Sequence, residues 1–205
     1  MGSVERFPRA RPAAVALAWR SGPTGTGEAL VREATLRDLE GMQAVAPLSA
    51  RELEYRVYAF GSGQLVALRD GRIAGWATSM RRDWPLLSPG GDTLHVDTLA
   101  LDDSPPGHGA GRLLLLAQRS LCRRLNLRRL SMALPLPATE PPEDYARRVL
   151  WGDVPDATWR LLAAQGLQFC GVQRDFLPSG PAALFAWLNP LYAPPSPPAS
   201  ARECA

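Results

Sequence analysis

The chain has 205 residues, of which 46% are hydrophobic, and carries a formal net charge of +3. This length supports one full hydrophobic core and excludes two domains of ordinary size. All basic residues apart from the two histidines are arginines, lysine is absent, and isoleucine occurs once, at Ile73. This bias indicates a GC-rich bacterial coding sequence more than a basic function, so the charge balance says little about partners.

Three cysteines, Cys122, Cys170 and Cys204, are far apart and lack CxxC spacing. We therefore expect reduced thiols and no metal site. No apolar run approaches the roughly 20 residues that a membrane span requires. The run Pro12–Trp19 imitates the apolar part of a signal peptide, but it is short and no clean cleavage site follows. We expect a cytoplasmic protein.

Composition divides the chain into three parts. Residues 1–28 are rich in Arg, Pro, Gly and Ala, which predicts a flexible extension to which Ala13–Trp19 adds at most one strand. Residues 29–192 carry the periodic apolar patterns of a folded domain. Residues 193–205 form a tail rich in Pro and Ser, which we expect to be disordered.

The folded part begins with a strand at Leu30–Ala34 and a helix that Thr35 caps, with Asp38 near its positive end. Ser49 and Glu52 form a capping box for a second helix, which Gly61 terminates.

A β-hairpin follows, because Asp70-Gly71 supplies the positive φ angles of a type I′ turn between Gln64–Arg69 and Arg72–Ser79. Residues 81–92 form a long connection, which predicts either function or disorder. The next strand is Thr93–Leu101. Alternation along it places His95, Asp97, Leu99 and Leu101 on one face, so the two titratable groups share a surface.

This strand leads through the glycine turn Pro106–Gly111 into a helix over 112–125. The glycines allow a ligand to approach the backbone closely, and the unpaired N–H groups of a helix N-terminus attract phosphate. A tight turn without a ligand would need glycines as well. The next strand, Leu130–Leu134, lacks the acidic residue of a dinucleotide fingerprint, and the absence of lysine excludes a P-loop.

Five arginines lie on or beyond the last turns of that helix: Arg119, Arg123, Arg124, Arg128 and Arg129. No aromatic residues are interleaved with them, so a solvated helix end is favoured over a nucleic-acid surface. A helix over Glu143–Leu150 follows, and then a capped helix that ends at Gly166 and leads into a strand.

The pattern Pro106-Gly-His-Gly-Ala-Gly111 after the strand that ends at Leu101 resembles the acetyl-CoA loop of the GNAT superfamily of N-acetyltransferases, whose motif is Arg/Gln-x-x-Gly-x-Gly/Ala. Pro106 departs from it, because proline offers no donor for a phosphate, a contact that Arg112 could supply. The opening at residues 31–38 and the helix that runs to Gly166 are also similar to this family. Together with Phe185–Pro190 they resemble a subgroup that occurs alone or fused to carbon-nitrogen hydrolase domains.

The resemblance implies an α/β (α+β) fold with a mixed, mostly antiparallel sheet of six to seven strands, splayed at the middle and flanked by about four to five helices. It also implies acetyl-CoA as cofactor, with transfer of the acetyl group to a primary amine of a small molecule or peptide. The residues implied to hold the cofactor are Leu99, Ala100, Leu101, Pro106, Gly107, His108, Gly109, Ala110, Gly111 and Arg112.

For the chemistry, His95 is the predicted base and Asp97 its partner or the group that binds the cationic amine, since their positions resemble those of base residues in this family. Tyr55, Tyr58 and Trp84 are candidates for lining the acceptor site. Leu162 stands where the family's usual general acid is a tyrosine, and Tyr145 is a candidate replacement. The alternative function is therefore a catalytically degenerate domain that binds acyl-CoA as a sensor or scaffold.

Overall fold

An eight-stranded sheet forms the centre of the molecule, with the order β1-β2-β3-β4-β5-β6-β8-β7. The computed structural model describes residues 17–19, 29–84, 88–102, 109–177 and 180–194. The strands are β1 (Leu17–Trp19), β2 (Ala29–Glu33), β3 (Gln64–Arg69), β4 (Arg72–Arg82), β5 (Thr93–Leu101), β6 (Arg129–Pro135), β7 (Gln168–Leu177) and β8 (Gly180–Leu188). Neighbouring strands are antiparallel except β5 and β6, which are parallel.

Five α-helices flank this sheet in the part of the chain that the structure describes. They are α1 (Leu39–Val45), α2 (Ala50–Phe60), α3 (Ala110–Arg124), α4 (Pro142–Trp151) and α5 (Ala157–Ala164), with short 3₁₀ turns η1 (Leu36–Asp38) and η2 (Gly61–Gly63). The predicted fold class is confirmed. The sheet has one strand more than the six to seven expected, because β1, which the sequence allowed as an addition, pairs with β2.

The local sequence signals act as predicted. The Asp38 carboxylate accepts a hydrogen bond from the Thr35 N–H at 2.8 Å, and the Ser49 hydroxyl accepts one from the Glu52 N–H at 3.1 Å. Asp70 and Gly71 have φ angles of 49° and 75°, as the hairpin turn between β3 and β4 requires. These capping and turn residues fix the ends of η1, α2 and the hairpin.

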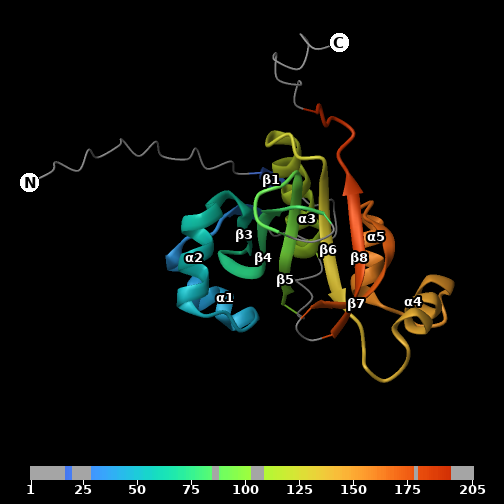
Figure 1. The fold of residues 1–205 in the computed structure, drawn as a ribbon. Coiled ribbons are helices and arrows are strands. Elements are labelled where there is room, and N and C mark those ends of the chain that lie inside the picture. Colours follow the sequence, from blue (N-terminus) through green and yellow to red (C-terminus); the bar gives the residue numbers. More distant parts are fainter. Residues whose placement is uncertain (1–16, 20–28, 85–87, 103–108, 178–179, 195–205) are drawn as a thin grey trace, which may run out of the picture.

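The sheet separates two hydrophobic clusters. The larger one joins α3, α5 and one face of the sheet, and Leu114, Leu115, Leu130 and Leu162 in it have no exposed surface. The smaller one lies under α1 and α2 and is built around Met42, Leu53, Val66 and Trp76. Figure 1 shows α1 and α2 to one side of the sheet and α3 and α5 to the other. The sheet is therefore the middle of three layers.

The sheet parts between β5 and β6. Their parallel pairing runs from Thr93 and Arg129 to Val96 and Met132 and does not continue, although β5 extends to Leu101 and β6 to Pro135. The predicted splay at the middle of the sheet is present. It leaves one side of the last five residues of β5 without a strand partner in the described part of the chain, so a gap opens directly before the glycine turn.

A β-bulge in β5 corrects the predicted faces of that strand. The register with β4 changes from Thr78 opposite Thr98 to Ser79 opposite Val96, which leaves Asp97 as the extra residue. Since one inserted residue reverses the alternation, Leu99 and Leu101 pack against the cluster that contains Leu94 and Val96. The sequence pattern predicted that these two leucines share a face with His95, but they lie on the opposite face of the sheet.

Several sequence predictions lie outside the described residues. These are the flexible character of residues 1–16 and 20–28, the disordered tail from residue 195 onward, and the turn residues Pro106, Gly107 and His108. The helix α3 begins at Ala110, two residues before the expected start, so the last two glycines of the motif belong to its cap and first turn.

The packing of α3 gives a first test. Leu114 is completely buried in the larger cluster, whereas Leu150 of α4 is 55% exposed. We expect Leu114→Ala to lower the free energy of unfolding by about 3 kcal/mol, because it removes buried surface and leaves a cavity. Leu150→Ala should change it by less than about 0.5 kcal/mol. Urea denaturation measures both, and equal effects of the two substitutions would contradict the described packing of α3.

Candidate active site

The start of α3 packs tightly against the end of β5. A Cβ atom added at Gly111 would lie 2.9 Å from Leu101 Cδ1 and 2.8 Å from Leu161 Cδ2, so only glycine fits there without a shift. A Cβ atom at Gly109, which caps α3, would meet no atom of the described residues within 4 Å. Gly111 thus has a packing reason to be glycine, whereas the described structure gives no such reason at Gly109.

The backbone at the end of β5 is oriented toward the gap. The Asp102 N–H donates to the Ala74 carbonyl of β4 at 3.0 Å. Because backbone groups alternate sides along a strand, those of Leu99 and Leu101 point away from β4, toward the side where β6 has parted. Two of the predicted cofactor residues, Leu99 and Leu101, therefore point their backbone N–H and C=O groups into the gap, where a ligand could pair with them.

His95 lies on the face of the sheet opposite α3. Its side chain is 3% exposed, its Nδ1 lies 2.9 Å from Ser131 Oγ of β6, and its ring meets the edge of Phe176 of β7 at 6.4 Å between centroids. Burial lowers the pKa of His95 to about 4, an effect that Asp97 opposes and Arg82 reinforces. The imidazole is therefore neutral at pH 7.

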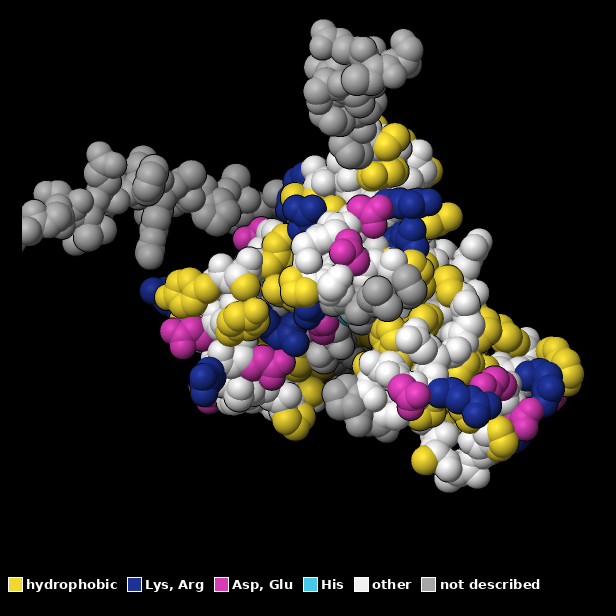
Figure 2. Space-filling model, viewed as in Figure 1, with side chains coloured by type: hydrophobic (Ala, Val, Ile, Leu, Met, Phe, Trp, Pro, Cys, Tyr) yellow, Lys and Arg dark blue, Asp and Glu magenta, His cyan; other side chains and the backbone are white. Residues whose placement is uncertain are grey.

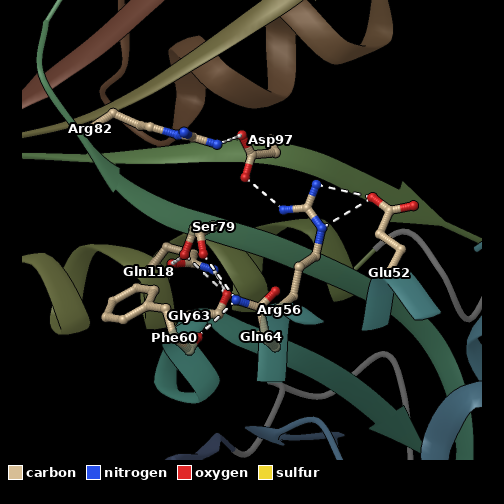
Figure 3. Close-up of polar contacts among 9 residues, drawn as sticks. All are labelled: Glu52, Arg56, Phe60, Gly63, Gln64, Ser79, Arg82, Asp97 and Gln118. Carbon is tan, nitrogen blue, oxygen red and sulfur yellow. Dashed lines mark hydrogen bonds and ion pairs between the residues drawn. The ribbon is translucent and has the colours of Figure 1, made fainter. Parts of the chain in front are cut away.

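Asp97 is held by two arginines from different elements (Figure 3). Its Oδ2 accepts from the Arg56 guanidinium of α2 at 2.7 Å, and its Oδ1 lies 3.8 Å from Arg82 NH2 of β4. Arg56 also pairs with Glu52 at 3.0 Å. The structure thus places His95 and Asp97 on one face, as predicted, but gives them separate hydrogen-bond partners.

A buried polar network joins the start of β3, β4 and α3. Gln64 Nε2 donates to the carbonyls of Phe60 at 2.8 Å and Ser79 at 2.9 Å. The Ser79 hydroxyl lies 3.0 Å from both the Gly63 carbonyl and Gln118 Oε1, and Gln118 Nε2 donates to the same Gly63 carbonyl at 3.1 Å. Figure 3 shows these side chains clustered beneath β4. The network thus pairs the Ser79 carbonyl and hydroxyl at the start of β3, where the pairing of β3 with β4 stops at Gln64 and Thr78.

The face that carries His95 is open beside α2. The helices α1 and α2 pack on β3 and β4, around the smaller cluster. Figure 2 shows the surface hollowed between the lobe of α1 and α2 and the lobe of α4 and β7. A substrate could approach the end of β5 through this hollow.

Two of the aromatic candidates do not reach this face. Tyr55 and Tyr58 of α2 are 66% and 72% exposed, on a side of the helix away from Leu53 and Arg56, so they contact solvent. Trp84 lies after β4 and is half-buried, with the Arg129 guanidinium 5.6 Å from its ring centroid. Only Trp84 among the three is near the His95 face.

The position of the missing tyrosine offers no proton donor. Leu162 is completely buried in the larger cluster. The hydroxyl of Tyr145, the candidate replacement, donates to Asp156 Oδ2 at 3.2 Å, where Asp156 also caps α5. Tyr145 therefore supports the junction of α4 and α5 and does not face the gap.

Sequence reasoning missed Arg56, Arg82 and Ser131. The spacing of four residues between Glu52 and Arg56 could have indicated an ion pair on one helix face. No local pattern links Arg56 to Asp97, which lies 41 residues further on. Ser131 could have been found only from the parallel register that sets it opposite His95.

The family model for the Acetyltransferase (GNAT) family matches residues 30–150. The chain therefore belongs to this family of acyltransferases. No curated protein sequence matches it significantly.

Solved structures share this fold. The GphF GNAT-like decarboxylase in complex with isobutyryl-CoA has a TM-score of 0.62 at 21% identity, over 78% of this chain and 98% of that one. The loading GNATL domain of CurA from Lyngbya majuscula has a TM-score of 0.66 at 15% identity, over 78% and 98%. The phosphinothricin acetyltransferase from Sinorhizobium meliloti, in complex with AcCoA, has a TM-score of 0.54 at 19% identity, over 78% and 88%.

Among the described residues, no helix has the length and apolar character needed to cross a membrane.

The buried, neutral His95 makes stability depend on pH. Its pKa is about 4 in the folded protein and ordinarily 6.5, so the unfolded chain binds the proton first as the pH falls. The stability is fully present above pH 6.5 and falls toward pH 4. Relative to His95→Gln, which can still bond to Ser131, the wild type should lose about 3 kcal/mol over this window. Urea denaturation at several pH values measures the difference, and parallel pH profiles would contradict a neutral buried His95.

Proposed function

We propose that this protein transfers an acyl group, acetyl in the first instance, from a CoA thioester to the primary amine of a small molecule or peptide. The observation that carries the proposal is the gap between β5 and β6 with the glycine-capped N-terminus of α3 directly beyond it. Membership of the GNAT family supports it, as do the neighbours solved with isobutyryl-CoA and AcCoA.

CoA would bind along the end of β5. The pantetheine arm pairs with the backbone of Leu99 and Leu101 in place of the missing strand, and the pyrophosphate lies against the N–H groups of the turn from Gly107 to Gly111. The Arg112 side chain, exposed in the first turn of α3, would add a charged contact where Pro106 offers none. A backbone N–H near Leu101 would polarise the thioester carbonyl and stabilise the oxyanion.

The base would be His95, acting through a water molecule. Its neutral state at pH 7 leaves it able to accept a proton, and the contact with Ser131 fixes the ring. A group with a lowered pKa holds a proton weakly, so His95 relays the ammonium proton of the acceptor to solvent rather than storing it.

Asp97 would act in positioning, because Arg56 and Arg82 already occupy its carboxylate. It joins α2 and β4 beside the bulge and so shapes the wall of the hollow. The cationic acceptor would enter between α2 and the β7–β8 hairpin, with Trp84 at one end of the same face.

The second candidate function is binding of acyl-CoA without turnover, as a sensor or scaffold. The buried Leu162 and the engaged Tyr145 favour it, since neither supplies a general acid for the leaving thiolate. A thiol-release assay with acetyl-CoA over a broad panel of amines, combined with calorimetry of CoA binding, separates the two. Thiol release that depends on an amine supports transfer, whereas CoA binding without release supports the sensor.

Further parts of the proposal rest on the sequence. The closing helix and Phe185–Pro190 support a place in the subgroup also found fused to carbon-nitrogen hydrolase domains. The lysine-free composition supports a bacterial protein, and the three separated cysteines support a cytoplasmic one. The arginines at the end of α3 have no aromatic residues interleaved with them, which argues against nucleic-acid binding. A salt-dependent affinity for DNA or RNA would overturn the last point.

The open space at Gly109 allows a binding test. Gly109 and Gly61 both have helical backbone angles and room for a Cβ atom. Both alanine variants should therefore keep the wild-type unfolding free energy to within about 0.5 kcal/mol. Gly109→Ala should weaken CoA binding about tenfold or more, because the methyl group enters the space of the pyrophosphate, and Gly61→Ala should not. Calorimetry measures both, and unchanged binding by Gly109→Ala would place the cofactor elsewhere.

The role of His95 predicts a loss of rate. His95→Gln should lower amine-dependent thiol release by about 10²-fold at pH 7, since the relay of the proton is lost. CoA affinity should stay unchanged, because His95 lies away from the glycine turn along β5. If the rate is the same as wild type from pH 6 to pH 8, His95 is not the base.

A further inference from the structure

Three arginines lie on the face of His95, but within the described residues only two carboxylates pair with them. Arg56, Arg82 and Arg129 lie on α2, β4 and β6, and their acidic partners within the described residues are Glu52 and Asp97. One positive charge is therefore not balanced by an ion pair. The proposed chemistry on amines does not explain this excess, because a protonated amine is repelled by it.

Arg82 is incompletely paired. Its distance of 3.8 Å from Asp97 Oδ1 exceeds a hydrogen bond, whereas Arg56 holds the other oxygen at 2.7 Å. Its Nε is buried with no hydrogen-bond partner among the described residues. A buried donor without a partner is costly, so Arg82 is a site where an added acceptor oxygen would be stabilising. Figure 3 shows its guanidinium extended along β5 toward Asp97.

Arg129 is a second donor on the same face. Thr93 of β5 pairs in register with both Arg82 and Arg129, and Ser131, two residues after Arg129, bonds to His95. The two arginine backbones thus flank β5 at a separation of about 10 Å. The Nε of Arg129 is also buried without a hydrogen-bond partner in the described part of the chain. Its guanidinium lies over Trp84, where a cation–π contact holds it without neutralising it.

The acids of the nearby connection bond to other groups. Asp83 accepts from the Ser88 hydroxyl at 3.1 Å, and Asp92 lies 3.3 Å from the Thr93 hydroxyl. Neither forms an ion pair with Arg82 or Arg129 within the described residues. Within the described residues, Arg82 and Arg129 therefore keep donors with which the acceptor oxygens of a ligand can pair.

We propose that Arg82 and Arg129 bind a carboxylate of the substrate on the face of His95. This inference rests on the proposed acyl transfer and names its substrate class. Either the amine acceptor is an amino acid, whose carboxylate lies a few bonds from the reacting nitrogen, or the acyl group itself ends in a carboxylate. Arginine suits this role because its planar guanidinium matches the two oxygens of a carboxylate.

The distances along β5 fit a short substrate. Asp97 precedes Leu99 by two residues, about 7 Å of strand, and the Arg82 guanidinium lies 3.8 Å from Asp97. A thioester carbonyl beside Leu99 or Leu101 is therefore within the reach of one small molecule from Arg82. A long spacer between the reacting atom and the carboxylate is unnecessary.

The first arm of the test compares acceptors. Amino acids and the matching amino acid amides, such as glycine and glycinamide, differ in the carboxylate alone. Thiol release from acetyl-CoA should give a kcat/KM at least about tenfold higher for the acid than for the amide, after correction for the fraction of free amine. Arg82→Gln and Arg129→Gln should each reduce this ratio several-fold. Arg72→Gln, at the exposed other end of β4, is the control and should keep the ratio.

The second arm compares acyl donors by binding alone. Calorimetry with succinyl-CoA and butyryl-CoA, which have acyl chains of equal length, shows whether the carboxylate belongs to the donor. Tighter binding of succinyl-CoA that Arg82→Gln abolishes and Arg72→Gln retains assigns it there. CoA itself should bind all variants equally, which reports that they are folded.

The outcomes separate this inference from the proposed function. Equal kcat/KM for acids and amides, together with equal binding of succinyl-CoA and butyryl-CoA, overturns the carboxylate site while acyl transfer stands. A preference that survives in Arg82→Gln and Arg129→Gln also overturns it. If no amine releases thiol but succinyl-CoA still binds tighter through Arg82, acyl transfer to amines fails and the carboxylate site stands.

Discussion

The parting of β5 from β6 is the constraint on which the rest of the site depends. Parallel pairing stops at Val96 and Met132, so the backbone groups on the β6 side of the end of β5 have no strand partner in the described structure. Buried backbone groups need partners, and a ligand that runs along β5 can supply them. The N-terminus of α3, packed on Leu101 through Gly111, stands at the end of that path.

The bulge at Asp97 sets the second half of the site. It turns Asp97 toward Arg56 and Arg82 while Leu99 and Leu101 return to the core under α3. On the other side of β4, the network of Gln64, Ser79 and Gln118 ties this strand to β3 and α3. The site is thus built on a rigid sheet rather than on loops, which suits a reaction that needs fixed geometry.

The charge on this face depends on the burial of His95 and on the arginine side chains around Asp97. His95 is neutral because burial outweighs the attraction of Asp97, and Asp97 is tied up in ion pairs. What remains is a neutral imidazole, a gap in the sheet that we propose to hold a thioester, and an excess of guanidinium groups. This combination fits a substrate that carries both an amine and a carboxylate, or a donor that carries an acid, better than a simple polyamine.

The sequence by itself determined the order and type of the elements, the caps at Thr35 and Ser49 and the hairpin turn at Asp70-Gly71, because each depends on neighbouring residues alone. It also indicated the family. Only the tertiary structure decided the partners of His95 and Asp97, the reversed faces of Leu99 and Leu101, and the exposure of Tyr55 and Tyr58. These depend on strand register and on a single bulged residue, which local sequence patterns do not encode.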